Sequence, residues 1–309
     1  MKFYFIVSSD EDTPTKNLLG KLKSFGEVII LRHKGPLGSI ENLKKDKNEK
    51  ILALDPGVFD WNLDTDSIKN IPNVKAVCTS STSFDWLKPK TLREINVVAC
   101  NVPGFSKDSV AEYAIAMAIE ITRKLPLMIK NNWKYDFSQT PMLLKGKIAG
   151  IIGLGRIGLR MAELCQGIGM KVIYWSKNTR DKRFEYVELD TLFKRADLIM
   201  PALVENDATK QLITHKRLDL MKKTANLVGI NRVRAIFDEN YIFQKVKKKE
   251  ISGYAFEGED VKKLNAYDGN VWALPAMIWF TKDSLEKLME IWVDNILAVA
   301  KGKPQNVVN

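Results

Sequence analysis

The chain has 309 residues, of which 45% are hydrophobic, and its 48 basic and 37 acidic residues leave a formal net charge of +11. This length allows two domains with separate cores. No apolar run approaches the ~20 residues that cross a bilayer, and the first residues lack the long apolar core of a secretory signal. We therefore expect a cytoplasmic protein that binds no membrane. The three cysteines form no CxxC pair and no metal-ligand spacing, so we expect no metal site.

The positive charge raises the question of a nucleic acid partner. The densest basic run, Lys247–Lys249, lies late in an amphipathic helical pattern, as it does on an ordinary solvated surface. No zinc-finger spacing or aromatic RNA-binding signature accompanies it. We expect no nucleic acid partner, and an anionic small molecule accounts better for some of the charge.

Short apolar segments alternate with polar ones over the first third of the chain. Polar segments such as Thr15–Phe25 and Glu41–Lys50 separate them. Strands that are apolar throughout, with helix-length spacing, indicate a parallel sheet covered on both faces. The predicted strands are Phe3–Ser8, Glu27–Leu31, Ile51–Leu54, Lys75–Thr79 and Val97–Cys100.

A long apolar helix is predicted within Asn101–Leu125. Ser109 and Glu112 have the spacing of a capping box, which predicts that the helix begins there. Because the pattern is apolar nearly all round, we expect this helix to be buried between domains or subunits.

A second alternation begins after Pro141 and predicts a doubly wound α/β fold of the Rossmann type. Its predicted strands are Lys147–Gly153, Lys171–Trp175, Leu198–Ala202, Asn226–Ile230, Ile251–Phe256 and Asn270–Leu274. Its predicted helices are Arg156–Ile168, Leu189–Arg195, Lys216–Lys223 and Asp238–Lys249, and an amphipathic helix follows at Lys282–Ala300.

The most specific motif is the glycine turn Gly153, Gly155, Gly158, which lies between a predicted strand and a predicted helix. The first glycine permits a tight turn, the second lets a diphosphate approach the backbone, and the third lets the helix pack on the strand. Arg156 and Ile157 then lie at the helix amino terminus, where free N–H groups bind anions. The motif predicts a nicotinamide dinucleotide site; the alternative is a glycine-rich turn without a ligand.

The residues after the second strand of this half indicate which dinucleotide is bound. An acidic residue there would bind the ribose hydroxyls of NAD. This chain instead has Ser176, Lys177, Asn178, Thr179 and Arg180, whose cations and hydroxyls suit a 2′-phosphate. We therefore predict NADP in preference to NAD. The alternative is an exposed polar loop that tolerates both.

At this point the chain resembles the D-isomer-specific 2-hydroxyacid dehydrogenases, which include glyoxylate/hydroxypyruvate reductases and phosphoglycerate dehydrogenases. The resemblance extends over nearly the whole length. It rests on Asn101–Ser106 with Val110–Glu112, Leu144–Ser176, Ala196–Asp197, Thr209–Ile213, Leu220–Lys222, Ile230–Arg234, Ile251–Gly253 and Asn270–Val271.

The resemblance implies a Rossmann domain at 104–282, beginning with a dimerisation helix, inserted in a flavodoxin-like substrate domain formed by 1–103 and 283–309. It implies a homodimer and hydride transfer between nicotinamide and C2 of a small 2-oxo or 2-hydroxy acid. In some relatives a tryptophan at the position of Trp133 reaches the neighbouring subunit, and packing between subunits is the alternative. The resemblance also assigns cofactor contacts to Thr209, Ile230, Arg232 and Glu257.

The family binds the substrate with one arginine and a glycine-rich loop. Arg234 matches the arginine, whose planar fork suits carboxylate and carbonyl oxygens, and Arg232 is a second candidate. The loop reads Ser80–Ser83 where relatives have glycines. We expect the N–H groups of Thr82 and Ser83 to hold the substrate carboxylate.

The family's proton donor is missing. Relatives have a histidine directly after a proline, but Ala276 follows Pro275 here, and Lys262 occupies the position of the supporting glutamate. One hypothesis is that Lys262 or a substrate-bound water supplies the proton. Two functions remain open: an oxidoreductase with an altered proton-donor site, and a catalytically impaired NADP(H)-binding sensor. The retained Arg234 favours the enzyme.

Overall fold

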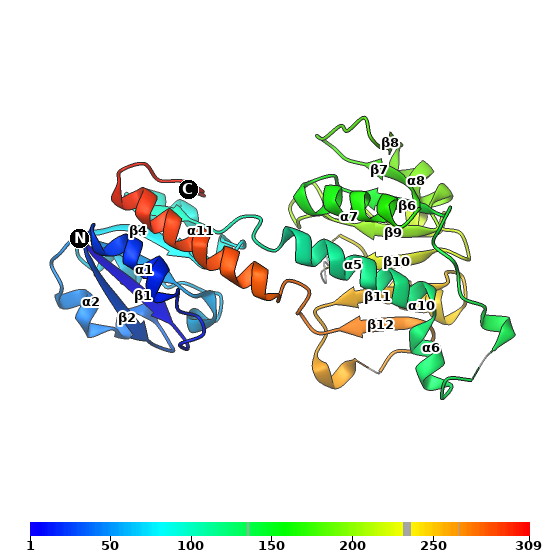
Figure 1. Cartoon of the computed structure of the whole chain (residues 1–309), viewed down its shortest axis with the longest axis horizontal. Helices are drawn as coiled ribbons and strands as arrows, with labels where there is room; N and C mark the ends of the chain where they lie inside the picture. The colour runs from blue at the N-terminus through cyan, green and yellow to red at the C-terminus, as the bar shows by residue number, and fades with distance from the viewer. Residues whose placement is uncertain (135, 231–235, 265) are drawn as a thin grey trace. The chain divides into compact units, whose positions relative to one another are not determined.

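The computed structural model describes residues 1–134, 136–230, 236–264 and 266–309. The chain forms two compact units. The first combines Met1–Phe105 with Lys282–Asn309, and the second is Ser106–Thr281 (Figure 1). Within the described residues, no helix is long and apolar enough to span a membrane.

The first unit contains a five-stranded parallel sheet in the order β2-β1-β3-β4-β5. Its strands are β1 (Lys2–Val7), β2 (Glu27–Arg32), β3 (Lys50–Leu54), β4 (Val74–Thr79) and β5 (Val98–Cys100). Numbered along the chain, this is the 2-1-3-4-5 order of flavodoxin-like sheets.

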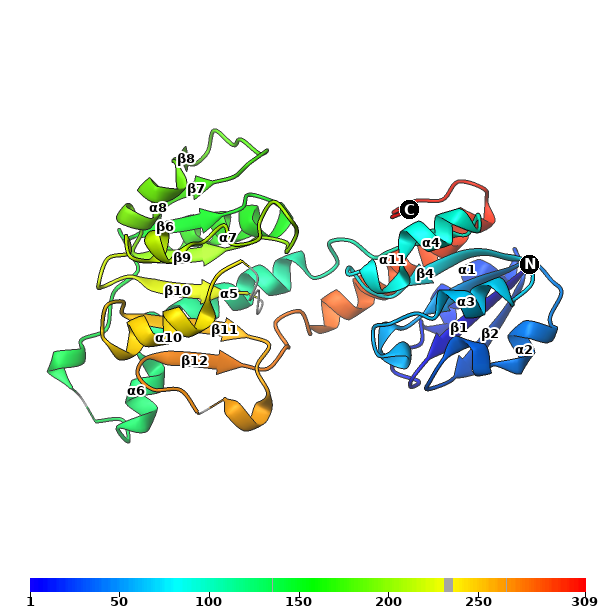
Figure 2. The same cartoon turned by 180° about the vertical axis from the view of Figure 1, so that it is seen from behind.

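Helices cover both faces of this sheet. One face is covered by α1 (Lys16–Lys23) and by α11 (Lys282–Ala300), which returns from the end of the chain. Trp292 of α11 is fully buried, lies edge-on to Phe5, and donates its indole N–H to the carbonyl of Cys78 at 2.8 Å. The other face is covered by α2 (Glu41–Lys45), α3 (Thr65–Lys69) and α4 (Pro89–Glu94) (Figure 2).

The second unit contains a seven-stranded parallel sheet in the order β12-β11-β10-β9-β6-β7-β8. Its strands are β6 (Ile148–Ile152), β7 (Lys171–Trp175), β8 (Glu185–Tyr186), β9 (Leu198–Pro201), β10 (Asn226–Gly229), β11 (Gly253–Glu257) and β12 (Val271–Leu274). The order 3-2-1-4-5-6, counted from β6, is that of the Rossmann fold, and β12 extends it by one strand. The predicted α/β class and Rossmann domain are confirmed.

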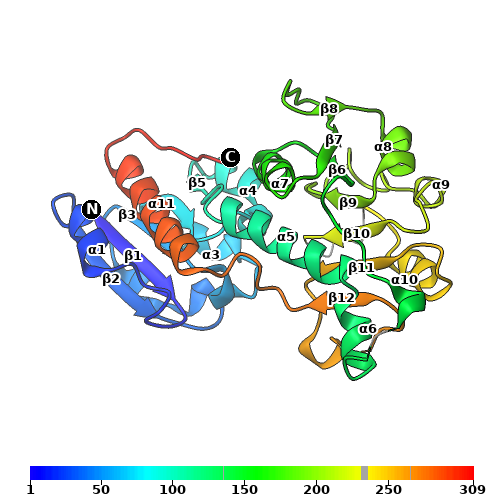
Figure 3. The ribbon, with the colours of Figure 1, turned by 45° about the vertical axis from the view of Figure 1, so that its right-hand side comes forward.

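This sheet also lies between two helical layers. The apolar sides of α5 (Lys107–Thr122) and α7 (Arg156–Gly167) pack on one face, and those of α8 (Leu189–Arg195), α9 (His215–Leu218) and α10 (Glu239–Lys247) pack on the other. Figure 3 shows the two helical layers on either side of the sheet. The short helix α6 (Leu125–Lys130) lies beside β12 (Figure 3). Short 3-10 turns occur at Leu37–Ser39, Pro56–Phe59, Asp85–Leu87, Phe137–Gln139 and Val261–Lys263.

Two sequence predictions about helix starts and lengths are wrong. The capping box fails because α5 begins at Lys107, so Ser109 lies inside its first turn and its hydroxyl donates to the carbonyl of Ser106 at 3.0 Å. The helix predicted at Lys216–Lys223 is the four-residue α9, which the Thr214 side chain caps by accepting the N–H of Arg217.

The sequence analysis missed β8. This strand has two residues, one exposed and one half-buried, so it carries no apolar run from which a strand is predicted. Its Tyr186 lies against the guanidinium of Arg180, whose carbon is 3.9 Å from the ring centroid.

Candidate functional site

The glycine turn follows β6 at the carboxyl edge of the second sheet. Gly153 has φ +96°, and its N–H donates to the carbonyl of Trp175 at 2.8 Å. A Cβ on Gly153 would lie 2.7 Å from the carbonyl oxygen of Ala202. Both the backbone conformation and the surrounding space therefore require glycine here.

Gly155 and Gly158 differ in the space around them. A Cβ on Gly158 would lie 1.9 Å from the carbonyl oxygen of Gly153, so α7 could not pack this closely on the turn. A Cβ on Gly155 would meet nothing within 4 Å, so the backbone there borders open space.

The amino terminus of α7 is free to bind an anion. Gly155 is its N-cap residue and offers no side chain, and the N–H groups of Arg156 and Ile157 have no acceptor in the part of the chain that the structure describes. Four N–H groups at a helix start lack intrahelical partners, and the helix dipole favours negative charge there. This twelve-residue helix, with open space at its cap, fits a dinucleotide diphosphate.

The end of β7 presents cations rather than a carboxylate. The buried hydroxyl of Ser176 accepts the N–H of Thr179 at 3.3 Å, while Lys177 and Asn178 are exposed. One nitrogen of Arg180 donates to the carbonyls of Ser176 at 2.7 Å and Thr179 at 3.0 Å. The structure therefore holds this loop in one compact turn.

Arg180 is further ordered by an aromatic ring. Its guanidinium carbon lies 3.9 Å from the ring centroid of Tyr186 in β8, and no carboxylate pairs with it among the described residues. Asp181 comes next in the chain, but Arg183 binds its carboxylate at 2.7 Å and lowers its pKa. The free donors of Arg180 thus remain available for an anion.

Two further predicted cofactor residues have other contacts. The hydroxyl of Thr209 donates to the carbonyl of Val204 at 2.6 Å and accepts the N–H of Asn206 at 2.9 Å, so it closes its own turn. Ile230 is buried against α5. Contact between either residue and the cofactor stays a prediction. Arg232 and Arg234 lie outside the described residues, so their assignments also stay predictions.

The loop after β4 offers free backbone donors in the first unit. The hydroxyl of Thr82 donates to the carbonyl of Val102 at 2.8 Å, and Ser81 donates to the carbonyl of Ser83 at 2.7 Å. Asn101 donates its amide to the carbonyl of Thr82 at 2.7 Å. These bonds hold the loop while the N–H groups of Thr82 and Ser83 have no acceptor within the described ranges. The supporting roles of Ser81 and Asn101 were not predicted, because they depend on contacts distant in sequence.

Glu257 lies at the end of β11 and is 9% exposed. Its Oε2 accepts the N–H of Met277 at 3.1 Å. Burial raises the pKa of Glu257 to about 7, although the N–H groups of Ile278 and Met277 act in the opposite direction. The carboxyl group is therefore bound to the loop that contains the exposed Ala276, where relatives were expected to have histidine.

Lys262 lies on the 3-10 turn Val261–Lys263 and is exposed. Its N–H donates to the carboxylate of Asp260 at 2.9 Å. Glu259, just before this turn, is a buried acid. Its carboxylate binds the hydroxyl of Tyr267 and accepts the N–H of Asp260 at 2.8 Å. The role proposed for Lys262 stays a prediction.

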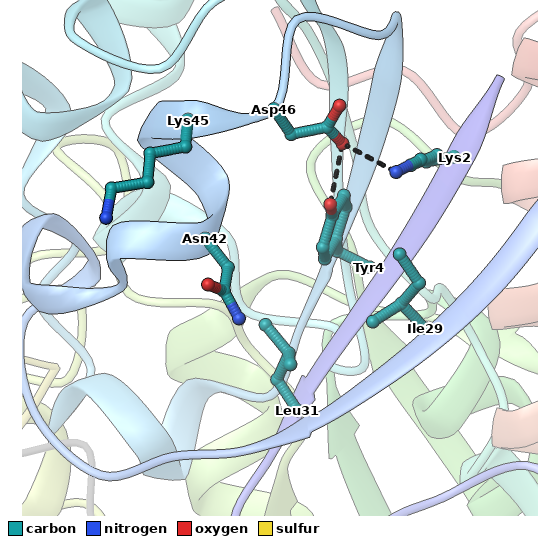
Figure 4. Close-up of a pocket in the computed structure, with 7 residues that line it drawn as sticks. All are labelled: Lys2, Tyr4, Ile29, Leu31, Asn42, Lys45 and Asp46. Atoms are coloured by element: carbon teal, nitrogen blue, oxygen red, sulfur yellow. Dashed lines mark hydrogen bonds and ion pairs between the residues drawn. The ribbon is translucent and has the colours of Figure 1, made fainter.

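A pocket of about 350 Å³ lies in the first unit, but its position does not suit the active site (Figure 4). Asp46 accepts the hydroxyl of Tyr4 at 2.6 Å and lies 3.5 Å from the ammonium of Lys2, so the charges are paired internally. Lys2 begins β1, whereas ligands of open α/β sheets bind at the carboxyl ends of strands. Its lining residues are Lys2, Tyr4, Ile29, Leu31, Asn42, Lys45 and Asp46.

The Rossmann sheet and the glycine turn define a dinucleotide-binding protein. Residues 113–279 match the family described as D-isomer specific 2-hydroxyacid dehydrogenase, NAD binding domain. The chain therefore belongs to the D-isomer specific 2-hydroxyacid dehydrogenases, and the expected resemblance is confirmed.

Individual proteins agree with this assignment. A glyoxylate reductase from Thermococcus litoralis is 28% identical over 95% of this chain and 94% of its own length. The solved structure of a D-lactate dehydrogenase with NAD+ from Lactobacillus jensenii has a TM-score of 0.81 at 21% identity, covering 100% of this chain and 99% of that one. An acyclic imino acid reductase in complex with NADPH and D-Arg has a TM-score of 0.80 at 24% identity, covering 100% of both chains. These two structures are similar in fold.

Replacing Gly158 with alanine is expected to destabilise the second unit, because the new Cβ would overlap the carbonyl of Gly153. Overpacking of this kind costs ~1–3 kcal/mol in the free energy of unfolding. Gly155→Ala is expected to cost less stability than Gly158→Ala, because its Cβ meets nothing within 4 Å and only the N-cap preference for glycine is lost. It is expected to weaken dinucleotide binding, since its Cβ would enter the open space beside the helix start. Denaturant unfolding and calorimetric titration with NADPH measure the two effects.

The matched control is Gly167→Ala at the end of the same helix, where a Cβ meets nothing within 4 Å. It is expected to stabilise the helix by ~0.5–1 kcal/mol and to leave NADPH affinity unchanged. Equal NADPH affinity in Gly155→Ala and the wild type would contradict the diphosphate site.

Proposed function

We propose that the chain is an NADP(H)-dependent reductase of small 2-oxo acids, which also performs the reverse oxidation of the 2-hydroxy acid. The observation that carries the proposal is the combination of the open helix start at Gly155 with membership of the 2-hydroxyacid dehydrogenase family. The named relatives are enzymes, and they offer no support for the alternative of an impaired sensor. A cytoplasmic location and the absence of a nucleic acid partner stay predictions.

The reaction makes three demands on the protein. The substrate carboxylate must be held, the charge that develops on the carbonyl oxygen must be stabilised, and a proton must be supplied. The first unit meets the first demand as the substrate domain, through the free N–H groups of Thr82 and Ser83. Arg234 is proposed for the second demand. The second unit acts as the nucleotide domain.

The cofactor supplies the hydride when it is bound, and the protein orients it. The N–H groups at the start of α7 hold the diphosphate. Arg180, already ordered by the Ser176 carbonyl and the Tyr186 ring, binds the 2′-phosphate together with Lys177. Glu257 contacts the nicotinamide end, as the family resemblance implies.

A second candidate is the reduction of 2-imino acids, and Ala276 favours it. A protonated imine, C=NH2⁺, accepts a hydride at carbon and becomes an amine without receiving a further proton. A site without the usual histidine is sufficient for that chemistry. The imino acid reductase reported above has the same fold and was solved with NADPH.

Purified protein is expected to oxidise NADPH in the presence of glyoxylate, hydroxypyruvate or pyruvate, because the open start of α7 suits a diphosphate and the free N–H groups of Thr82 and Ser83 suit a carboxylate. Absorbance of NADPH, followed with and without each acid, measures the turnover. The same assay repeated with added ammonia or an alkylamine tests imine reduction.

A rate that depends on the oxo acid alone supports the first function, and a rate that appears only with amine supports the second. Tight NADPH binding without turnover under either condition would overturn both.

Arg180→Ala is expected to lower NADPH affinity about tenfold and to leave NADH affinity unchanged, since a charge-assisted hydrogen bond contributes ~1.5–3 kcal/mol and exposure weakens it. Arg183→Ala is the matched control, because Asp181 and Glu163 already occupy its guanidinium at 2.7 and 2.9 Å. Fluorescence titration of the wild type and of both variants with NADPH and with NADH measures these affinities. An unchanged NADPH to NADH ratio in Arg180→Ala would contradict NADP preference.

The homodimer is also proposed, with support from exposed apolar side chains of the second unit. Phe137 is 92% exposed and Leu143 66% exposed, although apolar groups of this size are normally covered. They belong to a group close in sequence, which comprises Ile119, Ile129, Trp133, Phe137 and Leu143. A second copy of the chain would bury them.

Replacing both Phe137 and Leu143 with aspartate is expected to convert a dimer to a monomer, because two charges would have to be buried unpaired. Val204→Asp is the matched control, since Val204 is also highly exposed but lies outside this group. Size-exclusion chromatography with light scattering gives the mass. A wild-type monomer, or a double variant that stays dimeric, would contradict this interface.

A further inference from the structure

Reduction of a 2-oxo acid leaves one chemical requirement without a residue. Hydride addition at C2 places negative charge on the carbonyl oxygen, and that oxygen must receive a proton to become a hydroxyl. Ala276 has no proton to give. We propose that Glu257 is the proton donor of this enzyme, acting from beneath the loop that contains Ala276. The inference rests on the proposed reduction of an oxo acid.

The pairing of β11 with β12 places Glu257 next to the loop that contains Ala276. Its strand β11 pairs with β12 so that Glu257 is opposite Leu274, and the chain then continues through Pro275 and Ala276. The Oε2 atom of Glu257 accepts the N–H of Met277, the residue directly after Ala276, at 3.1 Å. An acid anchored this way lies within one residue of the vacated histidine position.

The surroundings of Glu257 keep it a weak acid. Burial dominates, and among the described residues no cation pairs with it. Helix α5 packs on β11 and contributes two titratable groups, Tyr113 and Glu120. Burial is the main cause that raises the pKa of Tyr113, and the negative charges of Glu120 and Glu257 raise it further. The neighbouring strands β10 and β12 contain no charged residue, and the nearby Glu259 is bound to Tyr267.

A carboxyl group with a pKa of about 7 is protonated in a large fraction of molecules at neutral pH. This is the state that a general acid needs, and burial in apolar surroundings is a common way to obtain it. Lys262 is less suited because it is exposed on a 3-10 turn, and no contact connects its ammonium to the loop after β12 in the described structure.

The proposed step balances. As C2 accepts the hydride, its carbonyl π-bond breaks toward oxygen, and the O–H bond of Glu257 breaks as a new O–H bond forms on the substrate. Glu257 is left as a carboxylate and regains a proton from water before the next turnover. In the reverse direction the carboxylate accepts the proton of the 2-hydroxy acid.

The decisive variant is Glu257→Gln, which keeps the size of the side chain and its acceptor for Met277 but has no acidic proton. It is expected to lower kcat for oxo-acid reduction ~10²–10⁴-fold and to change the Kd of NADPH far less, because the glutamine amide can still contact the nicotinamide end. The wild-type rate is expected to fall tenfold per pH unit above pH ~7, and this fall should disappear in the variant.

A second measurement does not depend on turnover. Infrared difference titration of the protein without substrate is expected to show a protonated carboxyl that ionises near pH 7, and the signal should be absent in Glu257→Gln. Glu120→Gln is the matched control, because burial also raises the pKa of Glu120 and, among the described residues, no hydrogen bond joins its side chain to the loop after β12. It should retain wild-type turnover and the Glu257 signal.

Four results would overturn the role of Glu257. The first is a wild-type kcat in Glu257→Gln, and the second is a loss of activity in that variant matched by an equal loss of NADPH affinity. The third is a loss of activity in Lys262→Ala but not in Glu257→Gln. The fourth is a wild-type rate that rises as the pH increases through 7. The last belongs to imine reduction, where an ionised Glu257 would stabilise the substrate cation. A wild-type chain that reduces no oxo acid would overturn the proposed function itself, while the infrared titration would still report the protonation of Glu257.

Discussion

The second unit depends on the close approach of α7 to the turn that leaves β6. Gly158 lies so near the carbonyl of Gly153 that not even a methyl group fits between helix and turn. This contact aims the start of α7 along the carboxyl edge of the sheet, and the absence of a side chain at Gly155 leaves its N–H groups open. An anion site therefore arises from backbone geometry, before any charged side chain contributes.

The turn after β7 and the loop after β4 are ordered by the same physical means. At both places side chains bind to backbone carbonyls and so fix a turn, while other donors remain free. Arg180 does this after β7, and Thr82 and Asn101 do it after β4. A turn that is already ordered loses little conformational entropy when an anion binds. The serines and threonine of the second loop thus maintain a shape that relatives were expected to obtain with glycines.

Ala276 stands where the family resemblance led us to expect a histidine, and this bears on what the carboxyl group of Glu257 can do. In the presence of an imidazolium, a nearby carboxyl group would be held ionised. Without it, Glu257 has no opposite charge among the described residues, and burial favours its protonated form. We therefore propose that an alanine at position 276 leaves Glu257 able to act as an acid. The direction of the pH dependence distinguishes that role from an anion that stabilises a cation.

The sequence by itself determined the class of the fold and indicated a dinucleotide-binding domain, because apolar runs, glycine spacing and helix periodicity are local properties. It predicted the bounds of α8 and α11 to the residue. It predicted the strands of both sheets, except β8, to within about two residues. It failed where contacts between distant segments decide the outcome. Ser109 was predicted to cap α5 but lies inside its first turn. The two-residue strand β8 was not predicted, and no sequence pattern indicated the contact between Tyr186 and Arg180. Only the tertiary structure brought the N–H of Met277 to Glu257, since burial and strand pairing act on residues that are far apart in the chain.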